Sequence, residues 1–285
     1  MTLPDLVDAA WLKAEIGAPD LVLLDASWYM PADARDPQAE FLQAHIAGAQ
    51  RFDFDKEIAD TSSSLPHMLP TPASFQQALR ALGVSMASRV VVYDTAGIFA
   101  APRAWWMLKV MGHEAVTVLD GGLPAWQAVG GAVVAGPAMR VPDGDFVARP
   151  NPVRLADSAQ LLAALNQAEI VDARAAARFA GTQPEPRQGL RSGHMPGARN
   201  LPFGEILQGG RYRPAREIKA LFAKAGITGA APIIASCGSG VTASVLALGA
   251  ELAGLGPIAV YDGSWSEWGQ ESRAELPVVT GAVPA

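Results

Sequence analysis

A single cysteine, Cys237, stands in the segment SCGSGVTA, between an apolar run and a helical pattern. The run APIIA is typical of a buried parallel strand, so Cys237 is expected at the carboxyl end of that strand. Ligand sites in open α/β sheets lie at this edge. With a stabilised thiolate, Cys237 would be a nucleophile for covalent catalysis. The other interpretation is a small buried hydrophobe, the usual state of a lone cysteine.

The residues after Cys237 have the composition of an anion-binding loop. Gly238 and Gly240 can adopt backbone angles that other residues avoid, so the N–H groups from Gly238 through Val241 and Thr242 can turn inward. The helix expected to begin near Thr242 adds partial positive charge at its N-terminus. Together these groups would stabilise a negatively charged sulfur or a substrate anion. The two glycines therefore favour the catalytic interpretation.

The elements that must position this loop follow an alternating β and α order. Short β-branched runs predict buried parallel strands at residues 21–25, 89–94, 115–122, 169–174, 231–236 and 257–264. Patterns with helical spacing predict helices at residues 74–83, 101–112, 216–227 and 242–256. The sequence therefore predicts an α/β fold with parallel sheets flanked by helices.

The order of elements occurs twice, and short pieces of sequence recur with it. HIAGA, which begins at His45, returns as HMPGA from His194, an offset of 149 residues. VLDGGLPAW, which begins at Val118, returns as VYDGSWSEW from Val260, an offset of 142 residues. Offsets so large and so nearly equal indicate two copies of one domain.

The boundary between the two copies is expected in a segment rich in proline and glycine. Residues 136–153 have neither the strand nor the helix period strongly, which is typical of a linker. We therefore predict a first domain at residues 1–135 and a second at 154–285. Alignment of GIFA in the first with GVTA in the second puts Asp94 opposite Cys237, so the first copy is predicted to be non-catalytic and the second catalytic.

Composition excludes several classes of partner and site. Of the 285 residues 50% are hydrophobic, and the net charge of -6 offers no electrostatic footprint for nucleic acid. One cysteine cannot form an internal disulfide or a zinc site built from several thiolates. The four histidines, His45, His67, His113 and His194, are too dispersed for a metal motif. We expect no metal.

The sequence also lacks signals for a membrane or for export. The first residues carry acids early and have no basic region before an apolar run. No uninterrupted apolar stretch approaches the roughly 20 residues of a membrane span. We expect a cytoplasmic protein with no membrane partner.

At these residues the chain resembles the tandem-domain rhodanese family of sulfurtransferases, from about Leu21 to Trp268. The loop CGSGVTA is similar to that of the family's 3-mercaptopyruvate sulfurtransferases. Thiosulfate-using relatives carry an Arg-Lys pair after the cysteine, where this chain has Gly238 and Ser239. Two fixed cations suit a sulfonate-bearing donor, so their absence favours 3-mercaptopyruvate.

The resemblance implies a mechanism in two half-reactions without a cofactor. Cys237 would attack the sulfur of 3-mercaptopyruvate, become a persulfide and release pyruvate. The outer sulfur would then pass to a thiol, to cyanide or to a reduced thioredoxin-like protein. A cysteine phosphatase would need an arginine at the sixth position after the cysteine, where Ala243 stands.

The resemblance also assigns residues outside the loop. It maps two substrate arginines onto Arg178 and Arg187, and guanidinium forks suit a keto acid's carboxylate. It places Asp55 and His67 in a relay with Ser239 that manages the proton as sulfur leaves. These five residues complete the predicted site.

Several alternatives stay open at this point. Within the same class, the chain would be a thiosulfate sulfurtransferase. In a different class, it would be a non-catalytic module that carries a persulfide or binds a protein. Outside the site, His45 and His194 are expected to brace the same turn in each domain, and Arg174 to make a structural ion pair.

Overall fold

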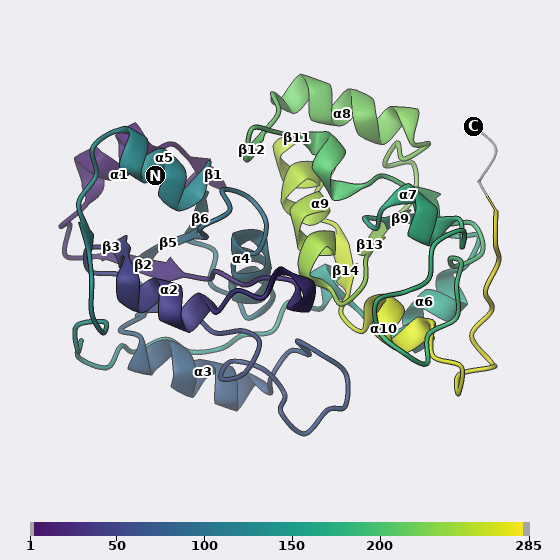
Figure 1. Ribbon diagram of the computed structural model, residues 1–285, viewed down its shortest axis with the longest axis horizontal. Coiled ribbons are helices and arrows are strands. Elements are labelled where there is room, and N and C mark those ends of the chain that lie inside the picture. Colours follow the sequence, from purple (N-terminus) through teal and green to yellow (C-terminus); the bar gives the residue numbers. More distant parts are fainter. Residues whose placement is uncertain (1–2, 282–285) are drawn as a thin grey trace. The chain divides into compact units, whose positions relative to one another are not determined.

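The structure is a computed structural model that describes residues 3–281. Its contacts divide the chain into two compact units. In Figure 1 most of unit 1 is coloured purple to teal, and most of unit 2 is coloured green to yellow. Unit 1 comprises the described residues within Met1–Thr61, Leu69–Asn151 and Gly209–Tyr212, and unit 2 those within Ser62–Met68, Pro152–Gln208 and Arg213–Ala285. The short segment that carries His67 is therefore grouped with unit 2.

The core of unit 1 is a five-stranded sheet with the order β1-β6-β5-β2-β4, in which every pairing is parallel. The strands are β1 (Leu6–Val7), β6 (Val116–Leu119), β5 (Arg89–Tyr93), β2 (Leu21–Asp25) and β4 (Gln50–Arg51). The central strand β5 has the sequence RVVVY, and its last four residues are buried. A strand covered on both faces needs such a continuous apolar run.

Helices cover both faces of this sheet. On one face the core contains residues of α1 (Ala9–Glu15), α2 (Pro37–Gln43) and α5 (Gly122–Ala128). On the other, α4 (Ala101–Val110) packs on β5 and β6, and α3 (Pro72–Ala81) contributes Phe75. Three helices begin where a side chain caps the first turn: Asp8, Asp36 and Thr71 accept backbone N–H groups of α1, α2 and α3.

Unit 2 repeats this architecture with its own strands in the corresponding order, β8-β14-β13-β9-β10. The strand pairings within this sheet are parallel. The strands are β8 (Leu155–Ala156), β14 (Ala259–Tyr261), β13 (Ile233–Ser236), β9 (Glu169–Asp172) and β10 (Arg199–Asn200). Cys237 thus follows the central strand, as Asp94 does in unit 1.

The helices of unit 2 also lie on two faces. α6 (Ser158–Ala164), α7 (Ala176–Phe179) and α10 (Ser264–Trp268) contribute to one apolar cluster on the sheet. α9 (Val241–Leu252) packs on β13 and β14, and α8 (Ala215–Lys224) packs on α9. The remaining short elements are β3 (His45–Ile46), β7 (Val133–Val134), β11 (Leu207–Gln208), β12 (Arg211–Tyr212), η1 (Pro31–Asp33), η2 (Pro152–Arg154) and η3 (Phe203–Ile206).

The predicted fold class, two similar α/β units with parallel sheets flanked by helices, is confirmed. All six predicted strands and all four predicted helices form, with ends shifted by zero to four residues. Four of the six strands, β5, β6, β9 and β14, end earlier than predicted, because residues that follow the apolar runs belong to the loops at the sheet edge. Those loops include the residues with candidate chemistry.

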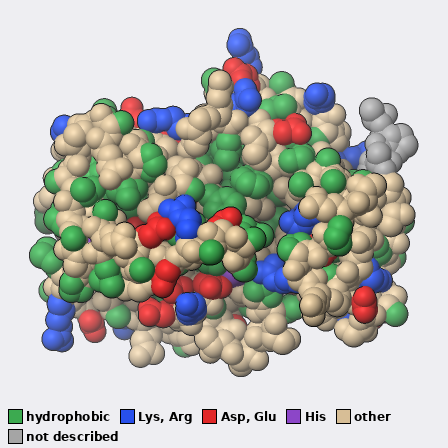
Figure 2. All heavy atoms as spheres, in the orientation of Figure 1, with side chains coloured by type: hydrophobic (Ala, Val, Ile, Leu, Met, Phe, Trp, Pro, Cys, Tyr) green, Lys and Arg blue, Asp and Glu red, His purple; other side chains and the backbone are tan. Residues whose placement is uncertain are grey.

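The surface of the described part carries both signs of charge. Figure 2 shows basic and acidic side chains interspersed on one face, in keeping with the small net charge of -6. Among residues 3–281, no helix combines the length and apolar character required to cross a bilayer.

Candidate active site

Cys237 lies directly after β13, and the residue is only 2% exposed. Its backbone is fixed from both sides, because its N–H donates to Ser264 Oγ at 3.1 Å and its carbonyl accepts the Trp265 N–H at 3.0 Å. Ser264 in turn donates through Oγ to the Tyr261 carbonyl at 2.8 Å. The first turn of α10 therefore holds the cysteine in place.

Ser264 has φ 47°, a left-handed conformation that costs free energy for a residue with a Cβ atom. Its two hydrogen bonds hold it there. Gly122 occupies the corresponding place in unit 1 and has φ 52°. Sequence reasoning missed Ser264, but the glycine at the matching position of the repeat was a usable signal of the required backbone angle.

The loop after Cys237 leads into α9 through a left-handed glycine. Gly240 has φ 78° and is the N-cap of α9, with no side chain capping the helix. Within residues 3–281, the N–H groups of Gly238, Ser239, Gly240 and Thr242 form no hydrogen bond. These donors, at the N-terminus of a 12-residue helix, can bind an anion beside the cysteine.

Ser239 and Val241, the other members of the loop, are both buried, and Thr242 is half-buried. Gly238 is fixed through its carbonyl, which accepts the N–H of Ser266 at 2.8 Å and its hydroxyl at 2.6 Å. The loop is therefore tied to α10 at two successive residues, Cys237 and Gly238.

Arg178, in α7, lies against this loop. A Cβ atom at position 238 would be 3.2 Å from Arg178 Nη2, so only a glycine leaves the guanidinium its present place without adjustment. The same arginine donates from Nε and Nη2 to the two carboxylate oxygens of Glu185, at 3.2 and 2.5 Å. One of the two predicted substrate arginines is thus brought to the cysteine loop.

Arg187 lines a cavity of about 480 Å³ within unit 2. It is the single cation among the described lining residues, which include Ser64 and Ser266. Because Ser266 also binds the Gly238 carbonyl, this cavity adjoins the backbone of the cysteine loop. A carboxylate in the cavity would find a guanidinium and hydroxyl donors.

The predicted relay residues are distributed between the units. His67 belongs to unit 2, is 4% exposed and has φ 61°, whereas Asp55 belongs to unit 1 and is half-buried. The Asp55 N–H donates to Asp53 Oδ1 at 3.0 Å, which fixes the local turn. Unit 2 by itself therefore contains Cys237 and Ser239 as well as His67.

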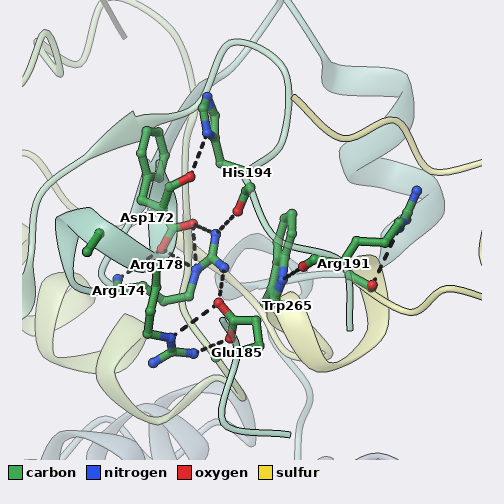
Figure 3. Close-up of polar contacts among 12 residues, drawn as sticks. Asp172, Arg174, Arg178, Glu185, Arg191, His194 and Trp265 are labelled. Atoms are coloured by element: carbon green, nitrogen blue, oxygen red, sulfur yellow. Dashed lines mark hydrogen bonds and ion pairs between the residues drawn. The ribbon is translucent and has the colours of Figure 1, made fainter. Parts of the chain in front are cut away.

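Arg174 forms the structural ion pair expected of it. Its guanidinium donates to both oxygens of Asp172, to Glu185 Oε1 at 2.9 Å and to the Gly193 carbonyl at 2.8 Å (Figure 3). It also lies 4.0 Å from the centre of the Trp265 ring. Burial alone would lower the pKa of Arg174, but the two carboxylates raise it, so the residue stays charged.

The two turn histidines have matching structural contacts, as expected. His45 Nδ1 donates to the Phe41 carbonyl at 2.7 Å, and His194 Nδ1 donates to the Phe179 carbonyl at 2.8 Å. Each ring also stacks on that phenylalanine, with centroids 3.9 and 3.8 Å apart. Burial lowers the pKa of His194. These contacts brace a turn in each unit.

Comparison with known proteins places this geometry in a family. The rhodanese-like domain matches twice, at residues 8–129 and 157–271. A 3-mercaptopyruvate sulfurtransferase from Escherichia coli is 43% identical, over 95% of this chain and 96% of that protein. A thiosulfate sulfurtransferase from Rattus norvegicus is 41% identical, over 97% of this chain and 95% of that protein.

The fold also has a close structural counterpart. The crystal structure of the 3-mercaptopyruvate sulfotransferase SseA from Escherichia coli superposes with a TM-score of 0.84 at 41% identity, and the match covers 92% of this chain and 99% of that chain. Relatives named for different sulfur donors have nearly the same identity to this chain. Sequence identity alone therefore does not indicate which donor this chain uses. The argument about the donor depends on the residues of the cysteine loop.

Proposed function

The chain belongs to the rhodanese-like domain family, and we propose that it is a sulfurtransferase that takes sulfur from 3-mercaptopyruvate through a persulfide on Cys237. The observation that carries the proposal is the loop itself: a cysteine at the end of the central strand, followed by N–H groups without acceptors among the described residues, with Arg178 against Gly238. Such a loop can stabilise both a thiolate and the persulfide anion formed from it.

The first half-reaction balances without a cofactor. The Cys237 thiolate attacks the sulfur of 3-mercaptopyruvate, a new S–S bond forms, and the C–S bond breaks with its electron pair passing to carbon. The proton of the substrate thiol moves to that carbon, so pyruvate and a persulfide anion result. In our proposal Ser239, His67 and Asp55 manage this proton transfer. The N–H groups of Gly238, Gly240, Val241 and Thr242 hold the charge on sulfur.

Donor choice follows from the residues at the loop. Gly238 and Ser239 supply no cation, so the loop lacks the pair of charges that would suit the sulfonate-like end of thiosulfate. Arg178 and Arg187 would instead hold the carboxylate of the keto acid, since guanidinium forks bind carboxylates with two hydrogen bonds. Thiosulfate is the alternative donor, in line with the relatives named for it.

The second half-reaction needs an acceptor that reduces the persulfide. We propose a thiol, including that of a reduced thioredoxin-like protein, with cyanide as a laboratory substitute. The acceptor thiolate attacks the outer sulfur, and the Cys237 thiolate leaves. We assign catalysis to residues 154–285, a non-catalytic role to residues 1–135 and a linker role to 136–153, in a cytoplasmic protein.

Steady-state assays with 3-mercaptopyruvate and with thiosulfate, each with cyanide as acceptor, test the proposal. We expect a higher kcat/KM for 3-mercaptopyruvate, and pyruvate released in step with thiocyanate. A clear preference for thiosulfate would contradict the argument from Gly238 and Ser239. Intact mass after exposure to donor separates the enzyme from a passive carrier: one added sulfur atom that is never passed on would favour the carrier.

A further inference from the structure

Four charged side chains form a buried cluster beside the cysteine loop. They are Asp172, Arg174, Arg178 and Glu185, shown together in Figure 3. The side chains of Asp172, Arg174 and Glu185 are each 1% exposed, and that of Arg178 is 18% exposed. Two guanidinium groups and two carboxylates make the cluster neutral, so each buried charge has a partner of opposite sign.

Within this cluster the arginines are held to very different degrees. Arg174 is fixed by Asp172, by the Gly193 carbonyl, by the Trp265 ring and by Glu185. Arg178 has one partner for its guanidinium among the described residues, and that partner is Glu185. The orientation of Arg178 therefore depends on a single carboxylate.

Glu185 binds both arginines and so connects Arg178 to the fixed Arg174. Its Oε1 accepts from Arg174 Nη1 at 2.9 Å and from Arg178 Nε at 3.2 Å, and its Oε2 accepts from Arg178 Nη2 at 2.5 Å. Both oxygens are thus occupied, and the carboxylate cannot turn without breaking a bond to one arginine. Arg178 Nη1 has no acceptor within residues 3–281 and remains available to an anion.

We propose that Glu185 is a positioning residue that orients Arg178 beside Gly238 for the carboxylate of the sulfur donor. The inference rests on the proposed function, because it assigns Arg178 to donor binding. Without the Glu185 charge, Arg174 and Arg178 would repel each other across the position that now joins them, and Arg178 would lose the pair of charge-assisted bonds that sets its plane. The donor would then have to order a mobile guanidinium when it binds.

The test is a set of variants assayed with 3-mercaptopyruvate and cyanide. Glu185→Gln is expected to raise KM about tenfold, the range for a lost charge-assisted hydrogen bond, and to change kcat by no more than about threefold. Arg178→Ala is expected to raise KM at least as much. In the double variant, Glu185→Gln should add less than about twofold to the effect of Arg178→Ala, because Glu185 acts through that arginine.

Glu251→Gln is the matched control, since Glu251 pairs with Arg154 at 2.6 Å and both side chains are largely buried. It lies near the far end of α9 from the cysteine loop and should lower Tm without raising KM. If Glu185→Gln does not fold, Glu185→Asp keeps the charge but is one methylene shorter, and KM should then rise about threefold. An unchanged KM, or independent effects in the double variant, would overturn the proposal.

Binding of pyruvate separates this inference from the proposed function. Calorimetric titration of wild-type protein with pyruvate reports carboxylate binding without turnover, and Glu185→Gln should weaken it about tenfold while Glu251→Gln leaves it unchanged. Weaker pyruvate binding in a protein that shows no turnover of 3-mercaptopyruvate would contradict only the proposed function. Normal turnover with unaltered pyruvate binding in Glu185→Gln would contradict only the role of Glu185.

Discussion

The loop after β5 in unit 1 and the loop after β13 in unit 2 have corresponding backbones, but their N–H groups have different hydrogen-bond partners. In unit 1 the Asp94 carboxylate accepts the N–H groups of Ala96, Phe99, Ala100 and Ala101 at 2.8 to 3.0 Å. In unit 2 the corresponding place holds Cys237, and among the described residues the N–H groups of Gly238, Ser239, Gly240 and Thr242 have no acceptor.

The surroundings of the two loops show that they are equivalent. The Asp94 carbonyl accepts the Leu123 N–H at 2.9 Å, and the Cys237 carbonyl accepts the Trp265 N–H at 3.0 Å, at matching points of the repeat. Each loop contains a left-handed glycine, Gly97 with φ 102° and Gly240 with φ 78°. Unit 1 therefore shows that this loop accommodates a negatively charged group, there the Asp94 carboxylate, and our proposal gives the corresponding place in unit 2 to a sulfur anion.

Cys237→Asp tests this comparison most strongly, because it gives unit 2 the residue of unit 1. Sulfur transfer should fall on the order of 10⁴-fold or more, since no nucleophile remains. The protein should nevertheless stay folded, with a Tm at or above that of Cys237→Ala, because the loop N–H groups gain an acceptor. Pyruvate release and thermal unfolding measure the two effects. A Tm well below that of Cys237→Ala would show that the loops are not equivalent.

Asp94→Asn tests the loop of unit 1. The amide keeps the shape and one acceptor oxygen but loses the charge that four N–H groups share, so the free energy of unfolding should fall by about 2 to 4 kcal/mol. Urea unfolding measures this change. Asp143→Asn, at an exposed position of the same unit, is the control and should change it by less than about 0.5 kcal/mol. Equal effects of the two substitutions would refute the anion-holding role of the loop.

Most of the fold could be predicted because its buried strands are apolar throughout. Runs such as RVVVY at β5 and IIAS at β13 are typical of buried parallel strands, and a helical pattern follows each run. The alternation of the two patterns predicts the α/β fold. Short helices such as α7, with four residues, were not predicted because their side chains do not complete a helical period. Their ends depend on packing against the sheet, which a single sequence does not display.

The site was only partly predictable for a different reason. The glycines beside Cys237 indicate an anion-binding loop from local chain geometry alone, whereas Glu185 matters through long-range pairing with Arg174 and Arg178. In the sequence TQPEPRQG, Glu185 has the pattern of a solvated surface residue, yet its side chain is 1% exposed. Burial of a charge between two guanidinium groups leaves no periodic trace in the sequence.

Arg187→Ala tests a further difference between the loops, since in our proposal only unit 2 takes its anion from a substrate. We expect KM for 3-mercaptopyruvate to rise roughly 10- to 100-fold, the cost of one charge-assisted hydrogen bond, with a smaller effect on kcat. Initial rates over a range of donor concentrations measure it. Arg213→Ala, a partly exposed arginine of the same unit, is the control. A KM equal to that of the control would remove Arg187 from donor binding.

The smallest expected effect concerns a property that the units share. Each contains a buried histidine, His113 in unit 1 and His194 in unit 2, and burial lowers the pKa of both below the usual value of about 6.5 for histidine. The unfolded chain therefore binds a proton at a pH where the folded chain does not, so stability present above about pH 6.5 is lost as the pH falls toward the folded-state pKa. The slope is at most about 1.4 kcal/mol per pH unit for each histidine.

Urea unfolding between about pH 7.5 and 5.5 measures this slope. His113→Gln and His194→Gln should each make the pH dependence of the unfolding free energy shallower. In the double variant the two reductions in slope should add, because the two histidines have no common partner among the described residues. The two loops carry different residues, Asp94 and Cys237, whereas the pKa of both histidines is shifted in the same direction. A slope that is unchanged in both single variants would mean that neither histidine stays neutral through burial.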